Sequence, residues 1–308
     1  IASPAELQRE VFGPVLHVLR YRRTGLDALL EAINQTGYGL TFGLHTRIDE
    51  TIAQVTQRIA AGNIYINRNI IGAVVGVQPF GGTGLSGTGP KAGGPWYLDR
   101  LLARVPAGSG AEDAAVIRPA PAAAALAYCR FLEARNHEAV AKRVAPYLHR
   151  SVLGAARDLR GPVGERNVRA LRPRGTIVAL ATTRFGALVQ LGAILATGNE
   201  ALVVADNPAA AELARLPQQI AALLRRCEDW RLAAPLAGVL FEGDAAALQG
   251  IAAQVATLAG PIVPIQSVTA GGLATGTEDY SLDALLEEVS ISTNTAAAGG
   301  NAQLMALG

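Results

Sequence analysis

The chain has 308 residues, half of them hydrophobic and 17% charged, and its formal net charge is +2. This length suits about two domains, each able to bury a substantial core, and the composition lies far from that of disordered chains. Basic residues are scattered rather than striped, which argues against a nucleic-acid or membrane-surface partner. The uncharged stretches are too short, or too interrupted by Gly and Pro, for a transmembrane segment. The densest basic cluster is interpreted as a solvated face before a strand; it consists of Arg166, Arg169, Arg172 and Arg174.

The cysteines and histidines indicate which cellular compartment and which kinds of site are expected. The two cysteines, Cys129 and Cys227, lie far apart in the sequence, which argues against a disulfide framework and favours the reducing cytoplasm. Cys129 lies within a predicted helical run and Cys227 near the end of another, and a structural free thiol is expected at both positions. The four histidines form no pair at metal-ligand spacing, so no metal site is predicted. Because the chain opens with Ile1, close to a strand-like segment and with no visible signal peptide, it is expected to lack its natural start.

The first hundred residues alternate strand and helix patterns. A helix is expected from an N-cap at Asp27 through Ile33, with Gly37 closing it. A second helix from Asp49 to Gly62 places four apolar side chains on one stripe, namely Ile48, Ile52, Val55 and Ile59. Strands are predicted at residues 15–21, 41–45 and 63–67. This alternation favours an α/β fold with a parallel sheet.

The following segments break and then resume the pattern. Residues 68–95 are rich in Gly and predict an ordered functional loop, and residues 105–120 predict a linker. Beyond it, helices are expected at residues 122–134, 138–155, 187–197, 209–226 and 245–258. Strands are expected at residues 175–181, 201–205, 236–241 and 261–268. A second α/β domain is therefore predicted.

Two generic phosphate-loop patterns in the Gly-rich segment are rejected. Gly82, Gly84 and Gly87 match G-x-G-x-x-G, but Pro79 precedes them and Pro90 follows, so no strand-to-helix turn is expected there. The stretch that begins at Gly84 also lacks the lysine and the Ser/Thr of a P-loop at their required positions.

Longer strings carry more information. Residues 10–15 (EVFGPV) closely resemble the E-x-F-G-P-V signature of the aldehyde dehydrogenase superfamily, and GYGL, NIYIN and PFGG follow in the same order as in that family. The resemblance implies that Glu10 accepts hydrogen bonds from the nicotinamide ribose of NAD and that Phe12 lies against the nicotinamide. A bare E-x-F would instead indicate a surface Glu and a core Phe.

Residues 67–95 resemble the proline utilization A family, whose members combine proline dehydrogenase with L-glutamate γ-semialdehyde dehydrogenase. In that family the loop before P-F-G-G anchors the aldehyde substrate, and its backbone N–H groups receive the α-carboxylate. The resemblance places Gly72 and Ala73 at these positions, and Phe80 matches an aromatic that packs on the aliphatic part of the substrate. A simple Gly-rich tether would explain the glycines but not Phe80.

The catalytic residues of this family are not recognised in the chain. The family attacks the aldehyde with a cysteine thiolate, transfers hydride to NAD and hydrolyses the thioester with a glutamate base. Both residues precede E-x-F in the family, so they would lie before Ile1. The chain alone is therefore expected to be inactive.

The second half resembles an aldehyde-dehydrogenase nucleotide-binding fold that has lost its ligand contacts. R-P-R-G at residues 172–175 and A-T-G-N at 196–199 match the family's first nucleotide-binding segment, but the ribose lysine is absent from the strand that ends near Ala205. Glu242 and Asp244 stand where a helix N-terminus would approach pyrophosphate, and negative charge there disfavours an anionic ligand. Coincidence between two α/β domains is the alternative. Residues 290–308 resemble the C-terminal motif of the longer family members, or else form a frayed terminus.

The expected architecture is α/β: the end of an aldehyde dehydrogenase catalytic domain at residues 1–104, a linker at 105–120, a noncatalytic, degenerate Rossmann-like domain of aldehyde dehydrogenase fold at 121–289 and a tail motif at 290–308. The resemblance implies a longer cytoplasmic enzyme that oxidises proline with FAD and glutamate semialdehyde with NAD through an internal channel. It leaves a homo-oligomer open. The alternative is a noncatalytic scaffold or assembly protein.

Overall fold

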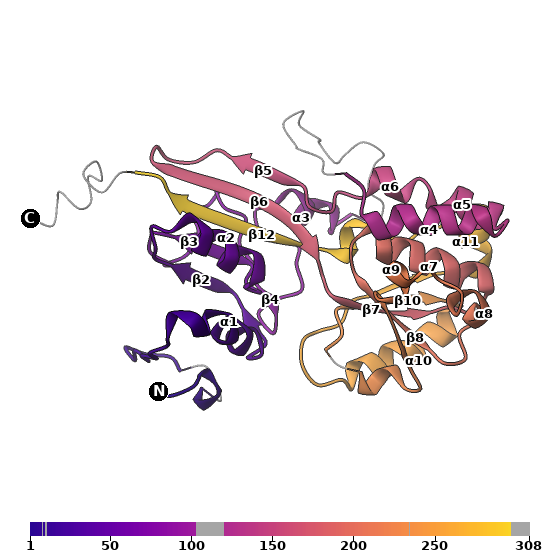
Figure 1. Ribbon diagram of the computed structural model, residues 1–308, viewed down its shortest axis with the longest axis horizontal. Helices are drawn as coiled ribbons and strands as arrows, with labels where there is room; N and C mark the ends of the chain where they lie inside the picture. Colours follow the sequence, from indigo (N-terminus) through magenta and orange to yellow (C-terminus); the bar gives the residue numbers. More distant parts are fainter. Residues whose placement is uncertain (8, 10, 103–119, 234, 297–308) are drawn as a thin grey trace, which may run out of the picture. The chain divides into compact units, whose positions relative to one another are not determined.

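The computed structural model describes residues 1–7, 9, 11–102, 120–233 and 235–296, and these form two compact units (Figure 1). The first unit comprises Ile1–Gly110, Asp158–Arg169 and Val289–Gly308. The second comprises Ala111–Arg157 and Ala170–Glu288. The first unit thus includes two segments that follow the predicted linker in sequence. Nearly all of that linker lies outside the described residues.

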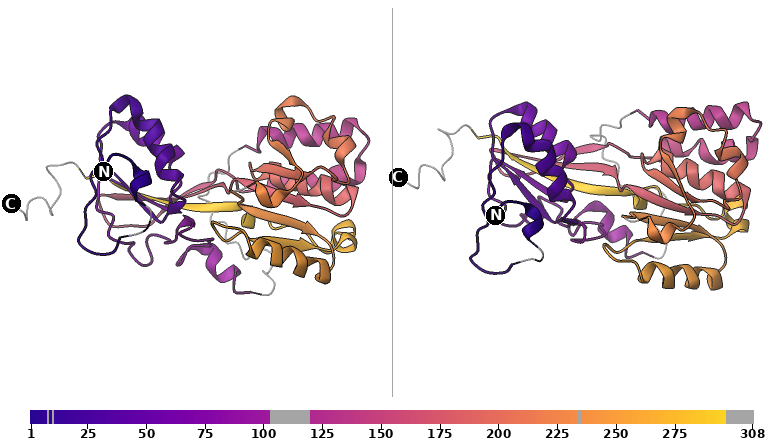
Figure 2. Two further views of the ribbon diagram at one scale, coloured as in Figure 1. Left: turned by 90° about the horizontal axis from the view of Figure 1, so that it is seen from below. Right: turned by 60° about the horizontal axis from the view of Figure 1, so that its bottom comes forward.

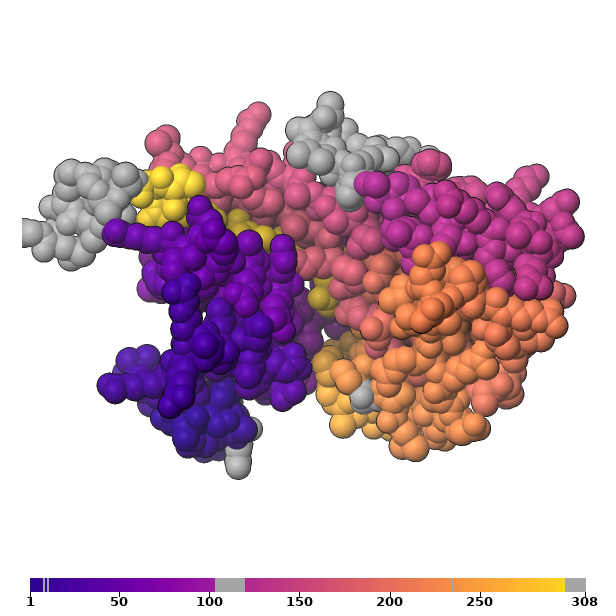
Figure 3. Space-filling view, in the orientation of Figure 1, coloured from indigo at the N-terminus to yellow at the C-terminus, as the bar shows by residue number. Residues whose placement is uncertain are grey.

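The first unit is built on a five-stranded sheet in the order β2-β3-β12-β6-β5. Strands β2 and β12 both run parallel to β3, and Ser290 of β12 lies opposite Asn63 of β3. In the space-filling view the yellow atoms of β12 lie beside the pink atoms of the segment that contains β6 (Figure 3). Its elements are α1 (Leu26–Asn34), β1 (Tyr38–Gly39), β2 (Thr41–Leu44), α2 (Asp49–Arg58), β3 (Asn63–Ile66), β4 (Thr83–Gly84) and α3 (Pro95–Asp99), with parts of β5 (Ala156–Leu159), β6 (Glu165–Pro173) and β12 (Leu286–Asn294).

The core of the first unit forms where two helices cover this sheet. Leu30 of α1 and Val55 of α2 are buried together with Ile64 of β3 and Val289 of β12. The predicted stripe on α2 is largely confirmed, since Val55 and the adjacent Ile59 are buried and Ile52 packs against them, whereas Ile48 stays exposed. Burial of such side chains supplies the main stabilisation of this layer.

The predicted strand at residues 15–21 is wrong. The segment has no regular structure, and most of its apolar side chains are exposed, Leu16 to 86%. A strand is stable only when its N–H and C=O groups pair with a neighbour, and no sheet of the described residues includes this segment. Asp27 lies in the first turn of α1 rather than at its N-cap, which is Gly25. Gly37 follows the helix with φ +77°, a conformation that favours glycine.

The second unit contains a five-stranded parallel sheet in the order β11-β10-β7-β8-β9. With its strands numbered along the chain and read from β9, this order is 3-2-1-4-5, that of the first five strands of a doubly wound nucleotide-binding fold. Its elements are α4 (Ala123–Ala134), α5 (Glu138–Val144), α6 (Tyr147–Arg150), β7 (Thr176–Leu180), α7 (Arg184–Ala196), β8 (Glu200–Val204), α8 (Ala210–Leu213), α9 (Gln218–Ala221), β9 (Leu224–Cys227), β10 (Gly238–Glu242), α10 (Ala245–Ala256), β11 (Ile265–Val268) and α11 (Ala270–Thr275).

Helices cover both faces of this parallel sheet. Ile177 of β7 faces the cluster that includes helices α4, α5 and α7, whereas the next residue, Val178, faces the cluster that includes α10. Figures 1 and 2 show α10 on the opposite side of the strands from α4 and α7. Two buried faces explain why the strands read as nearly continuous apolar runs. The predicted α/β class is confirmed.

Two predicted helices of the second unit are wrong because proline interrupts them. Pro217 separates α8 from α9 in the range 209–226, and the end of that range forms β9. Pro146 likewise ends α5 and begins α6, so the helix predicted at 138–155 is broken. Proline lacks the N–H that an interior helical turn requires.

The interpretation of the arginine cluster as a solvated face is also wrong. The segment is strand β6, and only Arg166 of the cluster is exposed. Arg169 is buried, and its guanidinium lies 4.6 Å from the ring centroid of Trp96. Alternation along the strand turns Arg169 to the opposite face from Arg166 and Arg172, and that face is buried.

Candidate functional site

The N-terminal segment carries the two residues assigned to nicotinamide binding. Glu10 lies outside the described residues. Phe12 is 88% exposed, and Gly13 beside it has φ +125°. The exposed ring of Phe12 offers a flat apolar face of the kind that packs on another planar ring.

The residues assigned to the aldehyde lie on the loop between β3 and β4, which is irregular, as predicted. Gly72 is exposed with φ +71°, and a Cβ there would meet no atom within 4 Å. Its N–H donates to the carbonyl of Ile70 at 3.0 Å. The amide of Ala73 has no hydrogen bond to another described residue. Of the two amides assigned to the carboxylate, that of Ala73 is therefore the more available.

Phe80 begins the return of the loop and is held by backbone pairing. Its N–H donates to Ala92 and its carbonyl accepts from the Ala92 N–H, at 3.0 and 2.9 Å. The ring is half-buried. An aromatic side chain fixed at its backbone and still partly open can pack on a bound aliphatic chain.

A buried lysine fixes the backbone that follows Phe80. The Lys91 side chain is 2% exposed, and its Nζ donates to Asn63 Oδ1 at 2.9 Å and to the carbonyl of Gly81. Asn63 itself donates to the carbonyl of Pro79 and accepts from the Gly81 N–H. The P-F-G-G turn is therefore positioned by β3 and Lys91.

Sequence reasoning missed a second set of polar contacts beneath this loop. Gln78 is 5% exposed and contacts residues that lie far along the chain, in β6 and β12. One signal could have indicated it, because Gln78 is the only polar side chain in residues 70–79. Its partners could not be identified from spacing.

In the second unit, the place where the fold family binds pyrophosphate is filled by a side chain. In doubly wound folds that place is where the strand order reverses, which here is between the carboxyl ends of β7 and β10. Glu242 at the end of β10 is fully buried there. Its carboxylate accepts from the N–H groups of Thr182 and Thr183 at 2.8 and 2.7 Å, and from both threonine hydroxyls.

This carboxylate lies at the first turn of α7, whose N-cap is Thr183. A Cβ at Gly186 would clash with the Glu242 carboxyl group, so the side chain fits closely against the helix. The protein thus supplies its own anion at the positive end of the helix. Asp244 does not share this position, because it caps α10 through the Ala247 N–H at 2.8 Å. The residues present do not fit a dinucleotide pyrophosphate.

A cavity of about 500 Å³ lies at the carboxyl ends of β8 and β9. Its lining includes Val204, Ala205 and Asn207 from β8 and the turn that follows it, and Cys227 from β9. The lining also includes one basic and one acidic residue, Arg226 and Glu228.

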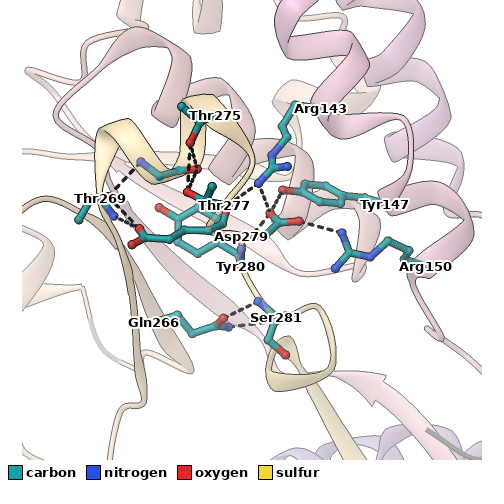
Figure 4. A network of polar contacts seen from close by, with 12 residues as sticks. Arg143, Tyr147, Arg150, Gln266, Thr269, Thr275, Thr277, Asp279, Tyr280 and Ser281 are labelled. Carbon is teal, nitrogen blue, oxygen red and sulfur yellow. Dashed lines mark hydrogen bonds and ion pairs between the residues drawn. The ribbon is translucent and has the colours of Figure 1, made fainter. Parts of the chain in front are cut away.

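A polar network in the second unit holds helices α5 and α6 to the segment after α11 (Figure 4). Asp279 accepts from the Tyr147 hydroxyl and from Arg150 Nη1, the latter at 2.8 Å, and lies 3.5 Å from Arg143. Burial and the neighbouring Asp279 raise the pKa of Tyr147. Asp279 thus links both helices to this segment, and we interpret the network as structural.

Among the described residues, neither a metal-binding group nor a membrane-spanning helix was found. Those residues contain no group of three or more His, Cys, Asp or Glu placed to hold a metal ion. Among the same residues, no helix is long and apolar enough to cross a membrane.

Comparison with known proteins shows what the chain resembles. Residues 4–104 match the model of the Aldehyde dehydrogenase family. The chain is also 50% identical over 304 residues to "Bifunctional protein PutA" of Rhizobium meliloti, covering 99% of this chain and 24% of that protein. The corresponding protein of Escherichia coli (strain K12) is 46% identical over 313 residues, covering 99% of this chain and 23% of that protein. The predicted resemblance to the proline utilization A family is confirmed.

Two further relatives cover different shares of the chain. "1-pyrroline-5-carboxylate dehydrogenase" of Bacillus subtilis (strain 168) is 47% identical over 92 residues, which are 30% of this chain and 18% of that protein. The structure of Proline Utilization A (PutA) from Corynebacterium freiburgense matches with a TM-score of 0.61 and 26% identity, covering 94% of this chain and 26% of that chain. The chain thus spans about a quarter of the length of its PutA relatives.

Proposed function

We propose that the chain is part of a longer NAD-dependent enzyme that oxidises L-glutamate γ-semialdehyde, the open form of 1-pyrroline-5-carboxylate, to glutamate in proline catabolism. The observation that carries the proposal is the loop between β3 and β4. It combines an exposed Gly72 and a half-buried Ala73 with a fixed Phe80, as a substrate with a carboxylate and an aliphatic chain requires. The similarity to a protein named 1-pyrroline-5-carboxylate dehydrogenase supports this assignment.

The proposed roles follow from the chemistry of each group. The N–H groups of Gly72 and Ala73 would receive the α-carboxylate, and the ring of Phe80 would pack on the methylene groups. Glu10 would accept hydrogen bonds from the nicotinamide ribose and Phe12 would lie against the nicotinamide. NAD would accept the hydride when bound. The nucleophilic cysteine and the glutamate base would be supplied by the remainder of the longer protein.

The two cysteines of the chain are unsuited to replace that nucleophile. Cys129 is buried in α4. Desolvation is the main cause that raises the pKa of its thiol, and the negative charge of the nearby Glu133 raises it further. Desolvation and then Asp229 raise the pKa of the Cys227 thiol as well. The thiolate is the reactive form, so both environments suppress nucleophilic attack.

The chain alone is therefore expected to produce no NADH from glutamate semialdehyde. The measurement is absorbance at the NADH band with purified 308-residue chain, NAD and substrate, against a blank without protein. A longer protein that includes the chain is the positive control. NADH formation above the blank, or covalent labelling of Cys129 or Cys227 by the aldehyde, would refute this expectation.

In the longer protein, Glu10→Ala should raise the KM for NAD roughly 2- to 10-fold, because hydrogen bonds of this kind contribute about 0.5–1.5 kcal/mol net. Proline oxidation should be unchanged, since the lost bonds would involve only the nicotinamide ribose. The exposed neighbour Arg9 provides the control variant, Arg9→Ala. Equal damage to both half-reactions would indicate misfolding instead of a lost NAD contact.

The wider proposal concerns the rest of the protein and the second unit. By analogy with relatives named bifunctional, the longer protein would also oxidise proline with FAD, pass the product through an internal channel and act in the cytoplasm, where free thiols persist. The second unit would be noncatalytic, because Glu242 fills its anion position. A scaffold role for the whole chain is the second candidate, and it is favoured only by that feature.

A further inference from the structure

A buried polar network lies between the loop after β3 and the two strands that reach the first unit from far along the sequence. The loop contributes Arg68 and Gln78, β6 contributes Glu165 and Asn167, and β12 contributes Ser292. All five belong to the first unit. Asn167 and Ser292 are 2% and 1% exposed, so the contacts form in a place that water reaches poorly.

Gln78 joins this network to the turn that carries Gly72 and Ala73. Its Oε1 accepts from the Val74 N–H at 2.9 Å. Its Nε2 lies 2.9 Å from Asn167 Oδ1, 3.1 Å from Glu165 Oε2 and 3.3 Å from Ser292 Oγ. The two N–H bonds of the amide therefore face acceptors on β6 and β12, while its oxygen faces the loop.

The chemistry of the partners fixes the orientation of this amide. The Val74 N–H can only donate, so the group that faces it must be the oxygen. The Glu165 carboxylate forms an ion pair with Arg68, and carboxylate oxygens accept hydrogen bonds. A flipped amide would place its N–H groups against the Val74 N–H and its oxygen against the carboxylate. Gln78 is consequently locked in one rotamer.

We propose that Gln78 is a positioning residue, which holds the Val74 amide and thereby the Gly72–Ala73 turn in the conformation that receives the α-carboxylate of the aldehyde. The inference rests on the proposed function for the identity of the substrate. The turn needs such support because its own side chains are small or exposed, Val75 to 98%. Backbone amides select a carboxylate only when their direction is fixed before the ligand binds.

The same contacts give β6 and β12 a role in substrate selection. Arg68 donates to Ser292 Oγ at 2.7 Å, and Ser290, two residues earlier on β12, donates to the carbonyl of Pro79 at 2.6 Å. Residues two positions apart on a strand point to the same face of the sheet. One face of β12 therefore holds both ends of the residue 68–79 segment.

The test uses the longer protein that contains the chain and compares Gln78→Ala with wild type. The KM for glutamate semialdehyde should rise roughly tenfold, whereas kcat and the KM for NAD should change less than about threefold. Butanal, which has no carboxylate, should be oxidised with kcat/KM within about threefold of wild type. Amide hydrogen exchange at Val74 should become at least roughly tenfold faster.

Two further variants separate positioning from folding. Glu165→Gln keeps the size of the side chain and removes the negative charge that pairs with Arg68. It should therefore shift the same parameters in the same direction by a smaller factor. Arg166→Ala, on the same strand, removes an exposed pair with Asp158 and should change none of them.

Equal losses for butanal and glutamate semialdehyde would overturn the inference, as would unchanged exchange at Val74 in a folded Gln78→Ala protein. A wild-type enzyme that does not oxidise glutamate semialdehyde would refute the proposed function instead. The exchange measurement then still decides whether Gln78 fixes the turn, because it needs no substrate.

Discussion

Truncating the chain after Val289 should unfold the sheet of the first unit. The removed residues include most of β12, which lies between β3 and β6 in the strand order. Ser290–Thr293 lie opposite Asn63–Ile66, all four of which are buried. Each buried backbone group left without a partner costs about 1–3 kcal/mol. A loss on the order of 5 kcal/mol or more approaches the whole stability of a typical domain.

The matched control is truncation after Ala296, which keeps β12 intact. Thermal melting by circular dichroism and hydrogen exchange of the Asn63–Ile66 amides should distinguish the two proteins. The shorter form should lose protection across β3, whereas the longer form should retain it. When the same truncations are made in the longer protein, only the shorter form should lose the proposed semialdehyde oxidation. Identical melting of both forms would show that β12 does not hold the sheet together.

The sequence predicted well those elements whose pattern is local. Helix α2 and strand β3 appear close to their expected bounds because their apolar periodicity reports directly on burial. The parallel sheet of the second unit was predicted for the same reason. Where two patterns competed, proline decided the outcome, as at Pro217, and an alanine-rich range did not remain helical.

Long-range pairing was beyond prediction from periodicity. Residues 15–21 alternate as a strand should, yet no neighbouring strand of the described residues pairs with them. Conversely, strands β6 and β12 were not predicted. The arginines of β6 and the small polar residues of β12 do not give the apolar alternation of a strand. Both are strands because partners far along the sequence complete their hydrogen bonds. The burial of Arg169 against Trp96 depends on that pairing and has no local signal.

In the candidate site, too, local motifs could be predicted but contacts between distant residues could not. Motif order predicted the loop with Gly72, Ala73 and Phe80, and the structure places them on one irregular segment. Their roles stay predictions. The support beneath the loop could not be foreseen, because Gln78 and Ser292 are 214 positions apart. In the second unit the sequence indicated misplaced carboxylates, but only the geometry distinguishes Glu242, which lies against α7, from Asp244, which caps α10.

Replacing Glu242 should destabilise the second unit strongly. In Glu242→Gln the side chain keeps its volume but loses its charge, and one of its two polar atoms becomes a donor that faces other donors. Hydrogen bonds to a charged group contribute about 1.5–3 kcal/mol each, and a favourable helix-end position adds up to about 2 kcal/mol. After allowance for the cost of burying the carboxylate, a net loss of roughly 2–4 kcal/mol is expected.

Asp244→Ala is the matched control, since it removes an exposed carboxylate from the start of α10 and should cost only about 1 kcal/mol. Urea unfolding of the chain, followed by the fluorescence of the buried Trp230 in the second unit, measures both. Equal effects of the two substitutions would show that Glu242 is not the internal anion of α7.

The same residue decides whether the second unit binds a dinucleotide. To bind, the pyrophosphate of NAD would have to displace the buried Glu242 carboxylate, which accepts four hydrogen bonds. If the carboxylate stayed in place, its negative charge would repel the pyrophosphate. Calorimetric titration of the wild-type chain with NAD should therefore show no binding to this unit. A micromolar dissociation constant that persists in Phe12→Ala would assign a nucleotide site to the second unit and refute the noncatalytic role, because the internal anion would then have failed to exclude the ligand.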